Sequence, residues 1–94
     1  MKLAGPVVIG PNCKIGEKTS ISDSVIWHDT VIGEGVKIKS SILADNCKIG
    51  DDVTLTAAVV GDHVTIIDGI KPKNGSRIMP GETVKSSDTE PQTI

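Results

Sequence analysis

Aliphatic residues recur every 17 positions along most of this chain, and this period constrains the fold more than any other feature. Three series of residues carry this period, and within each 17-residue repeat the members of the three series stand 6, 6 and 5 positions apart. The series are Ile9, Ile26, Leu43 and Val60; Ile15, Ile32, Ile49 and Ile66; and Ala4, Ile21, Ile38 and Leu55. A fixed repeat of this kind indicates a solenoid, in which most such residues serve stacking rather than chemistry.

The composition fits a narrow solenoid interior. The chain has 94 residues and a single aromatic side chain, Trp27, whereas a sandwich or helical bundle of this size would normally use larger side chains. Its net charge of −2, with both signs mixed, gives no electrostatic case for binding nucleic acid or an anionic membrane. No apolar run approaches the roughly 20 residues that span a bilayer, and no signal peptide is evident. We therefore expect a cytoplasmic protein.

Within each unit the residue types indicate short strands joined by tight corners. Second positions are often Gly, third and fourth positions are mostly turn formers, and fifth positions are small or β-branched. The third unit of each 17-residue set is one residue short, and we assign the gap to its sixth position. On that assignment the fifth positions are Val8, Cys13, Thr19, Val25, Thr30, Val36, Ile42, Cys47, Val53, Val59, Val64 and Ile70.

Over residues 4–70 this pattern resembles the hexapeptide repeat of left-handed β-helices. The sequence therefore predicts an all-β fold, a single-stranded parallel β-helix of about four coils, with the left hand implied by the resemblance. Residues 1–70 would form the coils, 71–85 a C-terminal cap and 86–94 a disordered tail. The repeat is already in phase at Ala4, so we expect either a chain cut from something longer or an open end that docks on a partner.

Two histidines are candidate catalytic groups, because acyltransferases of this fold use a histidine to deprotonate an acceptor while coenzyme A lies along a coil. His28 and His63 lie at the same type of corner, two coils and roughly 10 Å apart. Such enzymes usually place the base in a protruding loop, and this chain has no insertion between coils. At that separation the two rings cannot easily share a zinc ion, so we expect no metal site in this chain, and a site assembled between subunits is the remaining alternative.

Three outward positions hold apolar side chains that suggest an interface. Trp27 occupies a second position, where Gly is usual, and either lies over a neighbouring coil or contacts another subunit or domain. Val31 and Ile67 could extend that patch. Cys13 and Cys47 are also two coils apart, beyond the ~7 Å limit for a disulfide, so both are predicted to be reduced and inward-facing.

The run from Ser24 to Val53 resembles the C-terminal β-helix of sugar-1-phosphate nucleotidyltransferases, of the mannose-1-phosphate guanylyltransferase and glucose-1-phosphate nucleotidyltransferase type. Its diagnostic element is Ser-Val-Ile at Ser24, which recurs as Ser-Ile-Leu at Ser41 and, with Ala, at Ala58. In that family the active site lies in a separate N-terminal domain that uses a nucleoside triphosphate and Mg²⁺. The resemblance therefore implies no catalytic residue and no cofactor in this chain.

Two hypotheses follow. The first is a non-catalytic assembly domain that forms a homo-oligomer, a dimer or trimer, and packs on a catalytic domain absent from this chain. The alternative is a small stand-alone acyltransferase that uses coenzyme A, with His28 or His63 as base. No nucleic acid or membrane partner is expected on either hypothesis.

Overall fold

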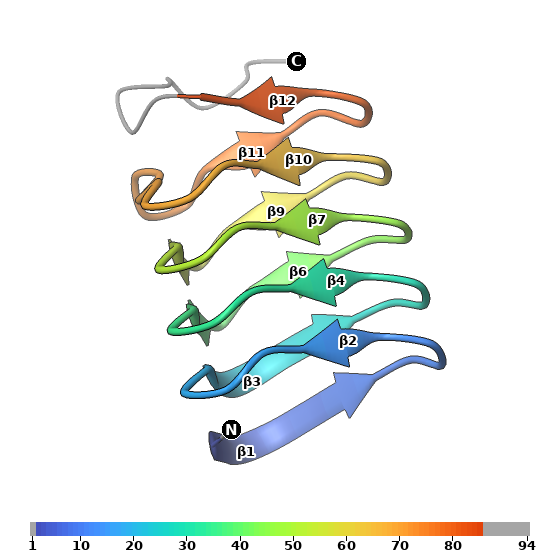
Figure 1. Cartoon of the computed structure of the whole chain (residues 1–94), viewed down its shortest axis with the longest axis vertical. Coiled ribbons are helices and arrows are strands. Elements are labelled where there is room, and N and C mark those ends of the chain that lie inside the picture. The colour runs from blue at the N-terminus through green and yellow to red at the C-terminus, as the bar shows by residue number, and fades with distance from the viewer. Residues whose placement is uncertain (1, 86–94) are drawn as a thin grey trace.

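The computed structural model describes residues 2–85, and every regular element in this part of the chain is a β-strand (Figure 1). The strands are β1 (Lys2–Ile9), β2 (Lys14–Ile15), β3 (Ser20–Ile26), β4 (Val31–Ile32), β5 (Lys37–Lys39), β6 (Ile42–Leu43), β7 (Lys48–Ile49), β8 (Thr54–Thr56), β9 (Val59–Val60), β10 (Thr65–Ile66), β11 (Arg77–Ile78) and β12 (Thr83–Val84). These described residues contain no helix long and apolar enough to cross a membrane.

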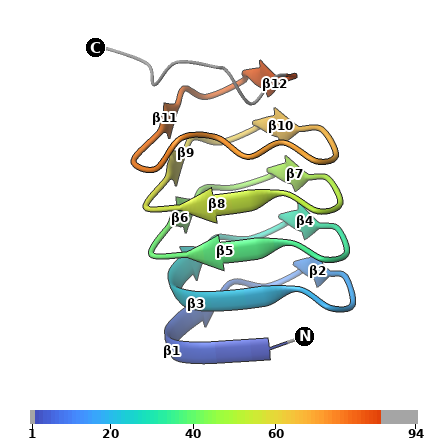
Figure 2. The same ribbon diagram turned by 90° about the vertical axis from the view of Figure 1, so that its left-hand side faces the viewer.

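The strands stack into a prism with three faces (Figure 2). The first face holds β5, β8 and the first half of β3, and the second face holds the second half of β3 with β6, β9 and β11. The third face is a separate sheet in the order β12-β10-β7-β4-β2. Strand β1 lies beneath β3 along both the first and the second face.

All pairings are parallel, and from β2 to β10 each strand pairs with residues 17 positions away. The Gly33 amide, for example, donates to the Ile49 carbonyl at 2.9 Å, one coil further along. The predicted parallel β-helix is confirmed. It has five turns rather than four, because residues 71–85, predicted to be a cap, carry β11 and β12 in line with the earlier strands. The predicted tail, 86–94, lies outside the described residues.

The aliphatic series point into the prism, as the period predicts. From the second coil onward their side chains are at most 3% exposed, as at Ile26, Leu43 and Ile49. Small or β-branched fifth-position residues such as Val36 and Val53 complete this core. Cys47 is buried and Cys13 half-buried, and neither forms a disulfide. The Cys47 thiol donates to the Gly61 carbonyl at 3.1 Å, and burial raises the pKa of this thiol.

The missing residue of each third unit is lost from the corner and not from the sixth position, which corrects the predicted fifth positions. Ser24, Ser41 and Ala58 are the inward residues there, each at most 2% exposed. Consequently Val8, Val25, Ile42 and Val59 are not inward fifth-position residues but point out of the prism. In these shortened corners one residue, such as Asp23 or Ala57, takes the left-handed backbone conformation that makes the tighter bend.

Inward hydroxyls link successive coils at the shortened corners. The Ser24 hydroxyl donates to the Ser22 carbonyl and accepts from the Ser41 amide at 3.0 Å. One coil further on, the Ser41 hydroxyl accepts from the Ala58 amide at 3.1 Å. The two serines therefore satisfy backbone groups that the tight bend leaves without a strand partner.

Glycine at the second positions is required by close approach between coils. A Cβ on Gly16 would lie 2.6 Å from the carbonyl carbon of Gly33 in the next coil, and a Cβ on Gly50 would lie 2.6 Å from the Asp68 amide nitrogen. Neither glycine has a positive φ. Trp27 occupies the same position in its coil, and its side chain is exposed.

Candidate functional site

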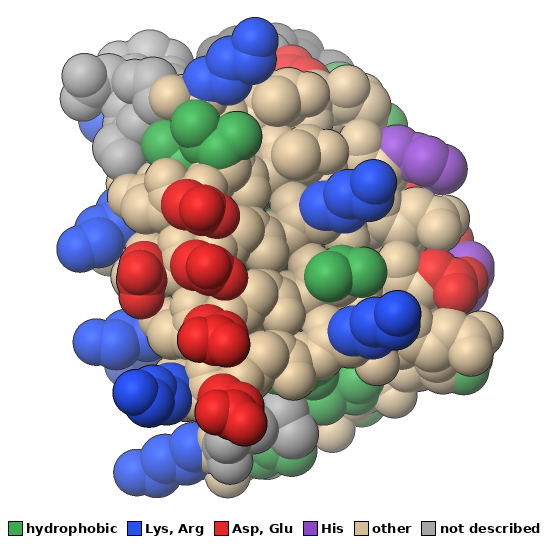
Figure 3. All heavy atoms as spheres, in the orientation of Figure 1, with side chains coloured by type: hydrophobic (Ala, Val, Ile, Leu, Met, Phe, Trp, Pro, Cys, Tyr) green, Lys and Arg blue, Asp and Glu red, His purple; other side chains and the backbone are tan. Residues whose placement is uncertain are grey.

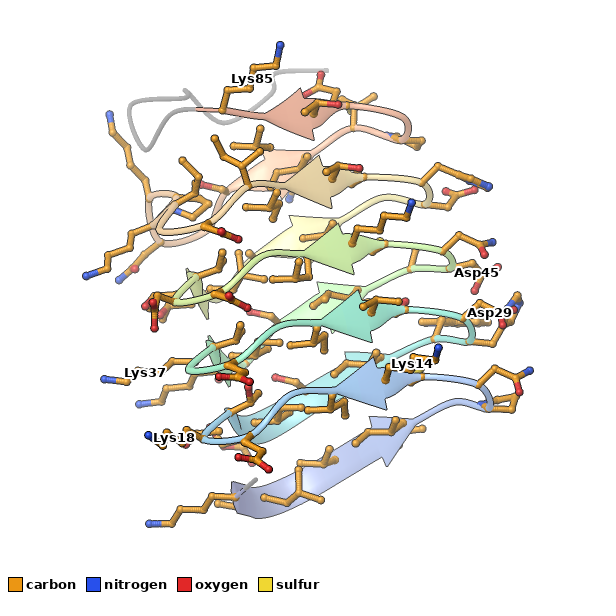
Figure 4. The ribbon with its side chains drawn as sticks, viewed as in Figure 1. Lys14, Lys18, Asp29, Lys37, Asp45 and Lys85 are labelled. Carbon is orange, nitrogen blue, oxygen red and sulfur yellow. The ribbon has the colours of Figure 1, made fainter. Side chains whose placement is uncertain are left out.

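His28 lies at a corner between the second and third faces and is held by two carboxylates. Its Nδ1 is 2.8 Å from Asp29 Oδ2, and its Nε2 is 3.1 Å from Asp45 Oδ2 in the next coil. Figure 4 shows Asp29 and Asp45 one above the other at this corner. The hydrogen bond to Asp29, followed by the charge of Asp45, raises the pKa of His28 above its ordinary value. This geometry favours an imidazolium that ties two coils together over a neutral general base.

His63 lies at the same edge, two coils further along, and has looser surroundings. Its Nδ1 is 3.9 Å from Asp62 Oδ2, and the side chain is mostly exposed. The backbone links Asn46 to His28 and His63 to Asp45, so the structure places the two histidines in separate coils, as predicted. Within residues 2–85 no three His, Cys, Asp or Glu side chains are placed to hold a metal ion.

Acidic side chains form a column along the corner between the third and first faces (Figure 3). The column follows the 17-residue register, and its members are Glu17, Glu34, Asp51 and Asp68. Two of them bond to the backbone one coil below: Asp51 Oδ1 accepts from the Glu34 amide at 2.9 Å, and Asp68 Oδ1 from the Asp51 amide at 2.8 Å. These two carboxylates therefore have a structural role in holding the corner.

The three predicted interface residues are all exposed, but the structure does not bring them together. Trp27 follows β3 at the edge of the second face and is 54% exposed. Val31 lies in β4 on the third face, beyond the His28 corner, and Ile67 follows β10 on that same face two coils further along. Trp27 therefore belongs to a different surface from the other two residues.

The second face carries an apolar stripe that the sequence did not reveal. We define the apolar stripe as Val8, Val25, Ile42 and Val59, which are partners in successive parallel strands. Three of the four are 46–59% exposed, and Arg77 takes the next place in the row. One sequence signal could have predicted the stripe, namely two adjacent apolar residues in a strand, such as Ile42 and Leu43. Because side chains alternate along a strand, one residue of each pair has to point outward.

A shallow hollow of about 220 Å³ adjoins the apolar stripe beside Trp27. Its lining is almost wholly apolar and consists of Val8, Gly10, Pro11, Val25, Ile26, Trp27 and His28. Gly10 stands one coil below Trp27 and has no side chain to fill the space. The hollow and the stripe together form one continuous apolar surface.

The parallel stack of short strands, its three faces and its 17-residue register define a parallel β-helix domain, and the family match that follows is to left-handed β-helices. The chain belongs to the family of the EIF2B subunit epsilon LbH domain, whose model matches residues 1–89. No curated protein matches the chain at a significant level.

Two solved structures are similar to this chain in fold. A hexapeptide transferase family protein from Anaplasma phagocytophilum is 27% identical, with a TM-score of 0.72 over 90% of this chain. A Bacillus cereus protein described as an acetyltransferase is 19% identical, with a TM-score of 0.50 over 92% of this chain, and this likeness shows the fold alone. The chain spans 60% of the first protein and 66% of the second.

Proposed function

We propose that this chain is a non-catalytic assembly domain, which joins copies of its parent protein and supports the parent's catalytic domain. The observation that carries the proposal is the exposed apolar stripe, because a row of uncharged side chains along one face is typical of an interaction surface. Membership of the EIF2B subunit epsilon LbH domain family supports this role. The position of His28 also supports a non-catalytic role. Its ring lies between two carboxylates, and this arrangement favours a structural contact.

The finer part of the proposal is a parent of the sugar-1-phosphate nucleotidyltransferase type. On this proposal the nucleoside triphosphate and Mg²⁺ bind in the parent's other domain, and the β-helix contributes none of their ligands. The support is the resemblance of the run from Ser24 to Val53 to the β-helix of those enzymes.

The coding sequence upstream of Met1 tests the parent directly. We expect an in-frame domain with a Gly-rich triphosphate loop, and a reading frame that encodes an unrelated domain would contradict the proposal. A second test is biochemical. The 94-residue chain, mixed with a nucleoside triphosphate, a sugar 1-phosphate and Mg²⁺, is expected to release no pyrophosphate, whereas the whole parent releases it.

A stand-alone acyltransferase is the second candidate, and the likeness to the Anaplasma hexapeptide transferase family protein favours it. On this alternative, coenzyme A would lie along a coil and His28 or His63 would take the proton from the acceptor. Calorimetric titration with acetyl-coenzyme A tests it. Binding to the wild-type chain, together with acetyl transfer that is lost in His28→Ala or His63→Ala, would overturn the non-catalytic assignment.

A further inference from the structure

The second face has two rows of outward side chains. The first row is the apolar stripe, which Arg77 continues in the fifth coil. The second row, here called the edge row, stands two positions after the stripe in each coil and consists of Gly10, Trp27, Ala44, Gly61 and Met79. Within the described residues, Arg77 is the only charged member of either row. The whole face is therefore suited to an apolar contact.

The side-chain sizes along the edge row fit the same row read in reverse. Trp27 and Gly61 stand one coil to either side of Ala44, and Gly10 and Met79 stand two coils to either side of it. When a second row runs in the opposite order, each large side chain meets a glycine and the small Ala44 meets itself. A row that is complementary to its own reverse favours a second copy of this chain as the partner.

The hollow beneath Trp27 lies at one end of the edge row, where Gly10 has no side chain to fill the space. In the reversed row of a second copy, the residue at this place is Met79. The volume of the hollow, about 220 Å³, is below the roughly 300–1,000 Å³ that sites for small molecules usually enclose. Methionine is flexible enough to fill irregular apolar recesses, and its sulfur makes favourable contacts with aromatic rings. The hollow therefore suits the Met79 side chain of a second copy.

One two-fold axis produces all of these contacts together. The axis lies between the two copies at the level of the third coil and runs parallel to the strands, so it exchanges the two ends of the face and sets each row against the same row. Ile42 then lies at the axis and meets its own counterpart, and Val25 meets Val59. Arg77 meets Val8 at the rim of the contact, where its charged group stays in water.

The area of this contact is sufficient for a specific dimer. The prism measures 30 × 21 × 20 Å, so one face covers about 600 Å², and two complete faces in contact would bury about 1,200 Å². That area is at the lower end of specific protein interfaces. Because the axis is at the middle of the five coils, the two faces cover each other along their full length.

We propose that two copies of this chain associate through their second faces about this two-fold axis, with their coils in opposite order and Met79 of each copy in the hollow of the other. Trp27 of each copy lies against Gly61 of the other, and the two apolar stripes cover each other. This inference rests on the proposed assembly function and names its partner as a second copy. Val31 and Ile67 follow the third face and remain outside the contact.

The first test is self-association of the 94-residue chain, measured by analytical ultracentrifugation between 1 and 100 µM. The wild-type chain is expected to form a dimer. Trp27 is the only tryptophan, so its emission should shift to the blue and its quenching by acrylamide should fall as the dimer forms. A chain that is monomeric at 100 µM, or one that forms a trimer, would overturn the two-fold contact.

The position of the axis is tested at Ile42, which meets itself in the proposed dimer. Ile42→Lys and Ile42→Glu are each expected to weaken the dimer by about 30-fold or more, because like charges would meet at the axis. An equimolar mixture of the two variants should associate at least about 10-fold more tightly than either variant alone, since opposite charges then meet. Circular dichroism and urea unfolding establish that each variant is folded. A mixture that associates no better than its components would overturn the proposed axis.

Two further positions test the reversed order of the coils. Met79→Ala should weaken the dimer by about 10-fold by emptying the hollow, and Ile67→Ala on the third face is its control. Val8→Lys should dimerise about 5-fold more weakly than Val8→Glu at low salt, because position 8 faces Arg77 of the other copy. Equal affinities in Met79→Ala and Ile67→Ala, or in the two Val8 variants, would contradict the reversed order.

The outcomes for this inference and for the assembly function are distinguishable. A monomeric chain that still binds the purified catalytic part of its parent would refute the two-fold contact and leave the support role standing. A dimer that is disrupted by Ile42→Lys and restored by mixing with Ile42→Glu, from a gene that encodes no nucleotidyltransferase domain, would support the contact and refute the proposed parent.

Discussion

The first coil and the third coil have the same residue pattern but very different interiors. Leu43 and Ile49 in the third coil are at most 3% exposed, whereas their counterparts in the first coil, Ile9 and Ile15, are only partly buried. The difference is not chemical, since all four residues are large and aliphatic. It shows that in a solenoid an inward side chain is buried by the coils above and below it rather than by its own coil.

The first coil also lacks the hydroxyl link between coils. Its strand β1 pairs with β3 alone in the described part of the chain, with a register shift between Ala4 and Val7. Val7 stands where the later coils have Ser24 and Ser41, so no hydroxyl accepts an amide from the next coil at that point. The first coil is therefore the weakest part of the prism, and the following predictions test that conclusion.

The largest effect is expected from removing inward side chains. Leu43→Ala should lower the free energy of unfolding by about 2–5 kcal/mol, because it leaves a cavity between two coils. Ile9→Ala should cost only roughly 1–2 kcal/mol, since its site is already partly open. Urea unfolding at low protein concentration measures both. Equal losses would mean that a partner covers the first coil in solution.

A smaller loss of stability is expected when the hydroxyl that joins the third and fourth coils is removed. Ser41→Ala leaves the buried Ala58 amide without its acceptor and should cost about 1–3 kcal/mol in urea unfolding. The matched control is Ser20→Ala, because Ser20 points outward on the first face, and its change should be within about 0.5 kcal/mol. If both variants lost the same stability, the link between coils would have no special role.

The shortened corners offer a stabilising change. The first coil has Gly5 at positive φ, whereas a later corner places Ala57 at φ 53°. Left-handed backbone costs a non-glycine residue about 1–2 kcal/mol, and glycine's larger entropy loss offsets about 0.5–1 kcal/mol of that. Ala57→Gly should therefore stabilise the fold by about 0.5–1 kcal/mol in thermal or urea unfolding. Ala44→Gly is the control and should destabilise it, because Ala44 is not at positive φ.

The smallest effect is expected at the His28 corner, where the first coil has Pro11 in place of a histidine. The folded state raises the pKa of His28, so its protonated form contributes stability below the unfolded pKa of about 6.5, and that contribution is lost as pH rises through the folded value. The stability lost in His28→Gln should thus be greater at pH 5.5 than at pH 8.5.

Urea unfolding at the two pH values measures that difference. His63→Gln is the matched control, since it removes an exposed imidazole that has one carboxylate nearby rather than two. Asp45→Asn should reduce the pH dependence at His28 by removing its partner from the next coil. A greater loss in His28→Gln at pH 8.5 than at pH 5.5 would contradict the assigned geometry.

Most of the prism could be predicted from the sequence, and its apolar stripe could not. The 17-residue period identified inward residues such as Ile26 and Leu43, and it placed the two histidines two coils apart. It did not identify the apolar stripe, because a missing residue can be assigned to either side of a corner without changing the period. The choice decides whether Ile42 points into the core or outward.

The carboxylate partners of His28 show a second limit. Asp29 is its neighbour in the chain, but Asp45 lies 17 residues away and meets the ring only because coils stack in register. Many corners carry Asp, so the sequence could not single out this one. The same holds for the hollow, which depends on Gly10 lying beneath Trp27.

By itself the sequence determined the period, the strand class and the inward aliphatic rows, because these depend on local spacing and on the alternation of side chains along a strand. Only the tertiary structure decided which corner residue is lost, which face is apolar and which charges pair. Those features depend on the side chains that stacking places one coil apart. The spacing along the chain fixes the position of each corner only to within one residue.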